Sequence, residues 1–215
     1  LLGLWLLASC SEKPLSITPS DKLSDATIWT DTATANLFLN DIYNQLNAGP
    51  WSSVFTNLPA EVSNDPTDNY TDNTTYGPTG LPSDKLFNSS SYGPSSASQL
   101  FGPQWKNMYT YIRKCNLCIA KVSATSFPET AKKSMIAQAR FLRAYFYKSL
   151  IDLYGGVPLS TKVLDNTTQG DSIFYPRSSY ADCVSFIQSE CAAAAQDLPT
   201  ALPSYSLGHA ASVTA

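Results

Sequence analysis

Histidine is almost absent from this 215-residue chain, which contains only His209, and no more than 14% of its residues are charged. A histidine-based metal site or a catalytic triad therefore has little to draw on. The formal net charge is −3 and the basic residues are scattered, which does not suit a phosphate backbone. We expect no nucleic-acid partner, no metal and no cofactor.

The sequence also lacks a long apolar run. A membrane-spanning helix needs about 20 consecutive apolar residues. The first ten residues are uncharged and mostly apolar, and two small residues precede Cys10. This layout is typical of a bacterial lipoprotein signal peptide. We predict a signal at 1–9, a lipidated N-terminus and tether at 10–30, and a helical domain at 31–215, with acyl chains on Cys10 holding the protein at a membrane. The alternative is a buried strand with a core cysteine.

The chain has five cysteines, and their pattern does not form a complete reactive motif. Cys115 and Cys118 have the spacing of a redox or zinc half-site, but no second pair follows and both fall in the middle of an expected helix. We predict that they pack in the core. Cys115 and Cys191 lie within apolar helical stripes, so we expect both to be buried and slow to react. An exported location permits disulfides, but core packing is the more economical interpretation.

Apolar residues recur at spacings of three and four in four segments, whereas no long alternating strand pattern is present. This period indicates amphipathic helices. Expected ends are Asp31 as a cap, a capping box at Ser126 and Glu129, and a stop at Gly155-Gly156. The inward stripes are Ala35, Leu39, Ile42 and Leu46 in 31–46; Trp105, Met108, Ile112, Cys115, Ile119 and Val122 in a helix from Gln99; Ile136, Ala139, Leu142, Phe146, Leu150 and Leu153 in the third; and Tyr180, Val184, Ile187, Cys191, Ala194 and Leu198 in a helix from about Ser178 to Pro199.

Amphipathic helices in succession must stack to bury their faces. We therefore predict an all-α fold, a tetratricopeptide-like solenoid or bundle, although no clean 34-residue repeat can be identified. A long irregular loop, from about Asn47 to Ser98, separates the first two helices.

This loop combines aromatic rings with short carboxylates and amides. Sugars have apolar C–H faces and hydroxyl rims, so this combination suits a sugar site. In the alternative interpretation the aromatic side chains only anchor the loop to the helices. The candidate ligand-binding residues are Trp51, Asp65, Asp68, Asn69, Tyr70, Tyr76 and Tyr92.

The stretch from Ala139 to Leu159 carries a family resemblance. Its residues Arg140-Phe141-Leu142-Arg143-Ala144-Tyr145, followed by Leu153-Tyr154-Gly155-Gly156-Val157-Pro158-Leu159, resemble the signature of the SusD-like (RagB/SusD) nutrient-uptake lipoproteins. The similarity extends along essentially the whole chain, which lacks an initial Met and resembles the N-terminal part of these longer proteins.

The resemblance implies a non-enzymatic lipoprotein on the outer membrane, facing the cell exterior. It would bind oligosaccharide and pass it to a TonB-dependent transporter of the SusC type. It also implies that part of the glycan site lies in the long loop, where Leu58–Asp65 resembles a family stretch.

Two other functions were weighed. A glycosidase needs two carboxylates about 5 to 10 Å apart in a cleft, and the acidic residues of the loop more often indicate a solvated segment or acceptors for sugar hydroxyls. The second alternative is a helical repeat scaffold that binds a protein or peptide. Soluble glycans should quench tryptophan fluorescence in a glycan-binding protein and leave it unchanged in such a scaffold.

Overall fold

The computed structural model describes residues 25–47, 94–165, 167–200 and 210. Within these residues the secondary structure is helical and contains no strand, which confirms the predicted all-α class. The elements are α1 (Asp25–Ile28), α2 (Thr32–Asn47), α5 (Pro94–Ser123), α6 (Glu129–Tyr154), the short 3₁₀ helix η3 (Gly170–Ile173) and α7 (Tyr180–Asp197).

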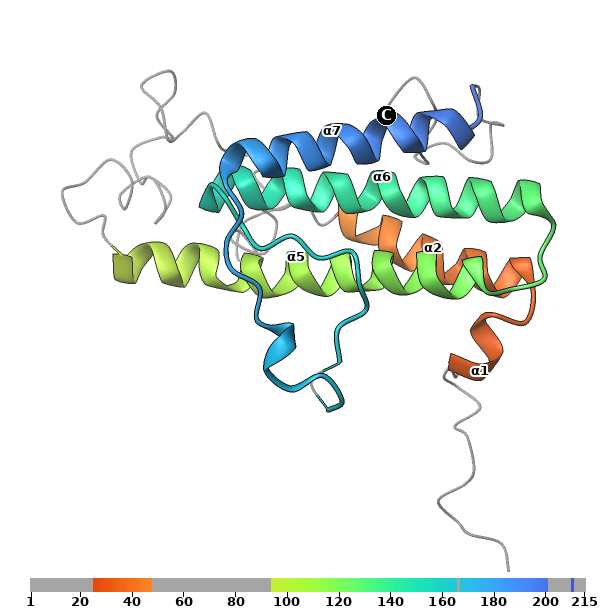
Figure 1. Ribbon diagram of the computed structural model, residues 1–215, viewed down its shortest axis with the longest axis horizontal. Coiled ribbons are helices and arrows are strands. Elements are labelled where there is room, and N and C mark those ends of the chain that lie inside the picture. The colour runs from red at the N-terminus through yellow and green to blue at the C-terminus, as the bar shows by residue number, and fades with distance from the viewer. Residues whose placement is uncertain (1–24, 48–93, 166, 201–209, 211–215) are drawn as a thin grey trace, which may run out of the picture.

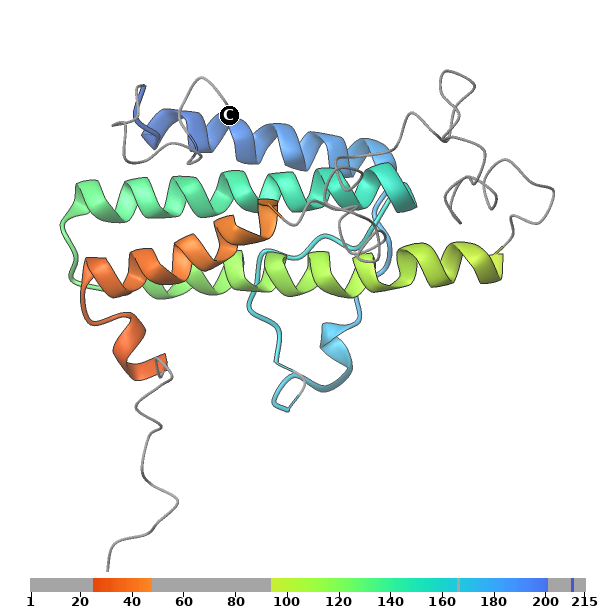
Figure 2. The same ribbon diagram turned by 180° about the vertical axis from the view of Figure 1, so that it is seen from behind.

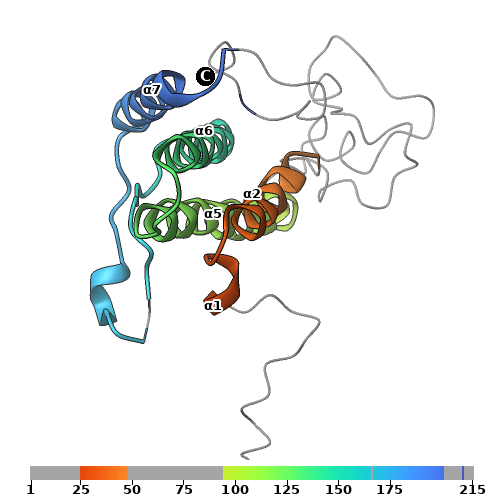
Figure 3. The ribbon, with the colours of Figure 1, turned by 90° about the vertical axis from the view of Figure 1, so that its right-hand side faces the viewer.

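The three long helices α5, α6 and α7 lie side by side, with α6 in the middle and antiparallel to both neighbours (Figure 1). Helix α2 packs against α5 and α6 from one side, as the reverse view shows (Figure 2). Seen end-on, the segment between α6 and α7 runs along the opposite side of α5 (Figure 3). No helix among the described residues is long and apolar enough to cross a bilayer.

The core forms where the helical stripes meet. Ala35, Leu39 and Ile42 from α2 are buried, and the corresponding stripes of α5 and α6 join them. The buried residues of these two stripes are Met108, Ile112, Cys115, Val122, Ala139, Leu142, Phe146 and Leu150. These positions confirm the predicted inward faces, since an amphipathic helix buries the side that carries its apolar residues.

Local interactions explain most helix ends. Asp31 caps α2 as predicted, because its Oδ1 accepts hydrogen bonds from the N–H groups of Ala33 and Thr34, both at 2.8 Å. The bond from the Thr34 N–H, and to a lesser extent that from Ala33, favours the ionised carboxylate and lowers the pKa of Asp31. At the far end of α6, Gly155 adopts a φ of +68° and donates its N–H to the Ile151 carbonyl at 3.1 Å, which suits a residue without Cβ.

The predicted capping box at Ser126 and Glu129 is wrong. Helix α6 begins at Glu129 with Pro128 as its N-cap, and no side chain caps it. Glu129 is thus the first helical residue rather than the third, so its side chain cannot serve the Ser126 N–H. It accepts a hydrogen bond from Lys132 Nζ at 3.1 Å instead.

Two other predicted positions need correction. Helix α5 begins at Pro94, so the end of the predicted loop, up to Ser98, is helical; proline is favoured in a first turn, but these residues lack apolar periodicity. Tyr180 is 56% exposed, because the inward face of α7 includes Cys183, Glu190 and Ala194. Because Glu190 is charged, the spacing of apolar residues does not identify this face.

Helix α1 lies within residues 10–30, which the sequence predicts as a tether, so the end of that segment is helical.

Of the four cysteines that the structure describes, three are core residues. Cys115, Cys118 and Cys183 are buried free thiols. Burial raises the pKa of Cys115 and brings that of Cys118 to about 12, because a thiolate loses its hydration there. This confirms core packing for the Cys115 and Cys118 pair. The predicted burial of Cys191 is wrong, since it is only partly covered.

Candidate functional site

The connection between α6 and α7 crosses the exposed side of α5 and forms a pocket there. It begins at Gly156, where a Cβ atom would lie 2.2 Å from the Ser178 carbonyl oxygen, so only glycine allows the two ends of the connection to approach. Ser178 N–H also donates to the Val157 carbonyl at 3.1 Å. We call residues 157–165, which lie along α5, the strap.

Two tyrosines hold the strap against the helices. Tyr109 of α5 donates its hydroxyl to the Pro158 carbonyl at 2.7 Å. The Tyr147 hydroxyl donates to the Ser160 carbonyl at 3.1 Å and accepts from the Ser160 N–H at 2.8 Å. Burial raises the pKa of Tyr109 above its ordinary value, and that of Tyr147 to about 12. Both phenols therefore stay protonated at neutral pH and remain donors.

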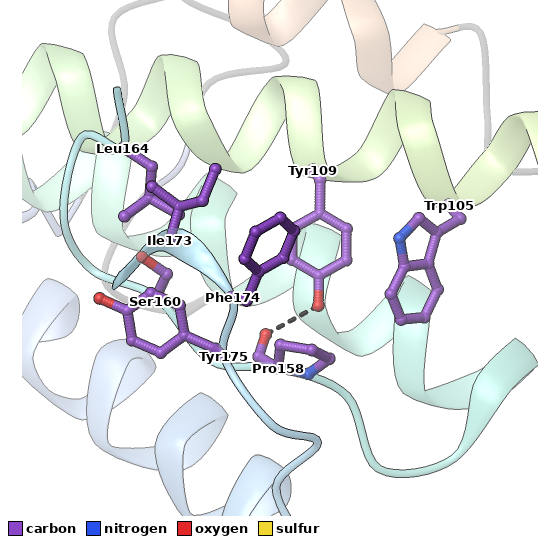
Figure 4. Close-up of a pocket in the computed structure, with 8 residues that line it drawn as sticks. All are labelled: Trp105, Tyr109, Pro158, Ser160, Leu164, Ile173, Phe174 and Tyr175. Atoms are coloured by element: carbon purple, nitrogen blue, oxygen red, sulfur yellow. Dashed lines mark hydrogen bonds between the residues drawn. The ribbon is translucent and has the colours of Figure 1, made fainter. Parts of the chain in front are cut away.

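The pocket lies between the strap, the end of η3 and one side of α5, and its volume is about 250 Å³. Figure 4 shows Trp105 and Tyr109 projecting from α5 on one side, with Phe174 and Tyr175 from the connection on the other. The ring centroids of Trp105 and Tyr109 are 5.0 Å apart. The lining residues are Trp105, Tyr109, Pro158, Ser160, Leu164, Ile173, Phe174 and Tyr175.

This lining is aromatic and uncharged, with a few hydroxyl groups. Phe174 is 75% exposed at the pocket. Small-molecule sites combine apolar and aromatic walls with a few polar groups that fix orientation, and the hydroxyls of Ser160 and Tyr175 belong to this lining. The pocket can therefore hold a neutral ring with an apolar face.

A buried polar network that joins α7, α6 and α5 supports the strap. Glu190 of α7 receives Arg140 and Arg143 of α6, with Arg140 Nη2 at 3.0 Å and Arg143 Nε at 2.9 Å from its carboxylate oxygens. Arg143 Nη1 donates to Asn116 Oδ1 at 2.7 Å. Asn116 Nδ2 in turn donates to the carbonyls of Ser160 and Lys162 at 3.1 and 3.0 Å.

The network is structural rather than reactive. The side chains of Arg143 and Glu190 are only 5% and 4% exposed, and each carboxylate oxygen of Glu190 accepts from arginine. A buried charge pair that is fully hydrogen-bonded holds one geometry. Because the chain of bonds ends on strap carbonyls, it links α7, α6 and α5 to one wall of the pocket.

No group of three or more metal-binding side chains occurs among the described residues. The pocket lining contains no carboxylate, imidazole or thiol, so these residues offer neither a nucleophile with its base nor a pair of acids. The chemistry that this arrangement supports is non-covalent binding.

Comparison with known proteins agrees with the helical arrangement. A family model described as "Starch-binding associating with outer membrane", SusD-like, matches residues 21–215. The chain belongs to the SusD-like family. A SusD-like protein of Formosa agariphila is 28% identical over 205 residues, which are 95% of this chain and 37% of that protein.

Two solved structures have the same fold, one of them a SusD-like protein. A SusD-like protein of Bacteroides fragilis is 26% identical, with a TM-score of 0.70 over 91% of this chain and 35% of its own. The surface glycan-binding protein A of Bacteroides uniformis is 18% identical, with a TM-score of 0.63 over 85% of this chain and 39% of its own. The chain thus spans little more than a third of the length of these SusD-like relatives.

The sequence-predicted site residues are not placed by the structure. Cys10 and the loop candidates Trp51, Asp65, Asp68, Asn69, Tyr70, Tyr76 and Tyr92 lie outside the described residues.

Sequence reasoning missed the pocket in this SusD-like chain. Trp105 was assigned to the core stripe, but it is only partly buried and forms a pocket wall. The run Ile173-Phe174-Tyr175 was not singled out, although it is an apolar interruption in a polar connection. Such a run is a local signal that could mark a binding site. Its position opposite Trp105 depends on how the connection folds back over α5, which the local sequence does not indicate.

Proposed function

We propose that the full-length protein is a non-enzymatic lipoprotein of the outer membrane that captures oligosaccharide outside the cell and passes it to a TonB-dependent transporter of the SusC type. The observation that carries this proposal is the SusD-like family match, described as starch-binding and outer-membrane-associated, across residues 21–215.

The described site supports binding without hydrolysis. Hydrolysis of a glycosidic bond uses two carboxylates in one cleft, whereas the pocket beside α5 has none in its lining. The partly exposed acidic residues Asp41 and Asp152 instead pair with Lys114 and Lys148 at 2.6 and 2.7 Å. In our proposal the remaining contacts to sugar come from the loop candidates named above, from Trp51 to Tyr92.

Replacing Cys10 by alanine should release the full-length protein from membranes. The substitution removes the thiol that would carry the acyl chains, and stable anchoring takes more than one chain at about 0.8 kcal/mol per buried methylene. Fractionation after labelling with a fatty acid is the measurement, with Cys191→Ala as the matched control that keeps both label and membrane retention. An unlabelled wild type, together with retention of the Cys10 variant, would contradict the lipoprotein assignment.

Glycan binding should depend on aromatic side chains of the loop. Full-length wild type is titrated against a panel of soluble plant, host and microbial glycans, and Tyr70→Ala, Tyr76→Ala and Tyr92→Ala are compared with it. A ring that stacks on sugar should cost on the order of 1 to 3 kcal/mol of affinity when lost, by analogy with base stacking. That corresponds to roughly 5-fold to 150-fold in Kd.

Thermal unfolding separates the two roles of each tyrosine. A ligand-facing ring contributes little to the folded apo protein, whereas a loop anchor should lose about 1 kcal/mol or more of stability. If wild type binds a glycan and no substitution weakens it, the contacts lie elsewhere. If no glycan binds, a scaffold for protein or peptide ligands becomes the better proposal.

A further inference from the structure

We propose that the aromatic pocket between α5 and the strap is itself a sugar subsite, which takes one neutral sugar ring by its C–H face and is separate from the 48–93 segment. This inference rests on the proposed glycan-binding function and assigns part of it to described residues. The pocket is the one lined by Trp105, Tyr109, Phe174 and Tyr175, among others.

The exposure of Phe174 is the first reason. Its side chain is 75% exposed although the pocket beside it contains other aromatic rings. Leaving a large ring in water forgoes the favourable free energy of burying it. A ligand that covers this ring regains that free energy on binding, and an apolar sugar face fits a flat aromatic surface.

The hydroxyl groups of the lining are the second reason. Within the part of the chain that the structure describes, the Tyr175 hydroxyl has no hydrogen-bond partner, and Ser160 Oγ has only long contacts of 3.4 Å with Lys162. Both groups can donate and accept, as recognition of sugar hydroxyls requires. No lining side chain is charged, although the guanidinium carbon of Arg177 lies 5.4 Å from the centroid of the Trp105 ring.

The pocket is also held in place and can be extended. The strap carbonyls of Pro158 and Ser160 are bound by Tyr109, Tyr147 and Asn116, so little ordering remains to be done on binding. A second pocket of about 200 Å³ adjoins it along α5 and shares Tyr109, Ser160 and Leu164 with it. A linear oligosaccharide could therefore place its next sugar unit in this second pocket.

The test compares two exposed aromatic residues in the full-length protein. Phe174→Ala removes a pocket wall, and Tyr180→Ala removes a ring that is 56% exposed and does not line the pocket. The probes are the soluble neutral hexasaccharides of the malto, cello and laminari series, titrated by calorimetry. We expect Phe174→Ala to raise the Kd of the bound hexasaccharide roughly 5-fold or more, by analogy with aromatic stacking of bases, and Tyr180→Ala to leave it unchanged.

A second variant approaches the same pocket by filling it. Ile173→Trp adds volume within the lining and should weaken binding at least as much as Phe174→Ala, and thermal unfolding checks that all three variants are folded. If wild type binds a hexasaccharide and both pocket variants match Tyr180→Ala, this subsite is refuted while the proposed function stands. If wild type instead binds another neutral glycan of the panel, the three variants are compared on that glycan. If it binds only acidic glycans, the neutral-ring subsite is refuted alone. If no glycan binds at all, both proposals fail.

Discussion

Replacing Phe146 by alanine should lower the free energy of unfolding by about 3 to 5 kcal/mol. Phe146 lies in the middle of α6 and is 1% exposed, with the ring of Tyr111 at 5.2 Å and that of Tyr145 at 5.8 Å between centroids. Truncation removes apolar contact and leaves a cavity between packed helices, which relax only partly. A loss of this size is comparable with the total stability of many domains.

The same substitution at an exposed position provides the control. Phe174→Ala removes an identical side chain that is 75% exposed, and it should change stability by no more than about 0.5 kcal/mol. Urea denaturation of the full-length protein measures both values. Equal midpoints for wild type and Phe146→Ala would mean that this face of α6 is not the buried one.

Replacing Glu190 by alanine should cost about 3 to 5 kcal/mol, because it leaves buried positive charge without its partner. Arg143 is 4% exposed. Among the described residues its guanidinium would retain Asn116 and the Phe186 ring, whose centroid lies 5.8 Å from the guanidinium carbon. Water cannot readily solvate the arginine at that depth, so the desolvation cost of the ion is no longer offset.

Two comparisons separate this effect from the loss of any ion pair. Asp152→Ala breaks the exposed pair with Lys148 and should cost no more than about 1 kcal/mol. A double variant, Glu190→Leu with Arg143→Met, removes both buried charges and should be more stable than Glu190→Ala alone. Denaturant unfolding measures all three. A Glu190→Ala protein as stable as Asp152→Ala would contradict the buried network.

A consequence for the pocket follows from the same network. Asn116 takes its orientation from Arg143 and binds two strap carbonyls. The pocket wall is thus connected to the buried charge pair between α6 and α7. Variants of Glu190 that remain folded should therefore be examined for sugar binding as well as for stability.

Much of the helical fold could be predicted from periodicity. The stripes that contain Leu39, Ile112 and Phe146 are buried as expected. Apolar residues spaced three and four apart lie on one face of a helix, and that face packs against the neighbouring helices. Asp31 and Gly155 were also identifiable, since a short polar side chain and a residue without Cβ suit the two kinds of helix end. Each of these signals is local.

Other features depended on neighbours distant in the sequence. Glu190 faces inward only because two arginines of α6 lie opposite it, and a single-helix pattern classes such a glutamate as exposed. Pro128 rather than Ser126 is the N-cap of α6, because two local signals compete in this short segment. Cys191 and Tyr180 fall on the predicted stripe, yet α6 does not cover them fully.

The candidate binding residues also fall into two groups, those that contiguous sequence predicts and those that only the fold brings together. Contiguous sequence signals predict an aromatic and polar ligand loop and a lipid-bearing Cys10, and both stay predictions because they lie outside the described residues. The pocket was not predictable, since Trp105 and Phe174 are 69 residues apart in the sequence and form opposite walls only after the connection folds back across α5. Sequence by itself determined which faces are apolar and where helices can stop. Tertiary structure decided which polar groups are buried together and which aromatic rings face one another, because both depend on contacts between segments that have no local signal for each other.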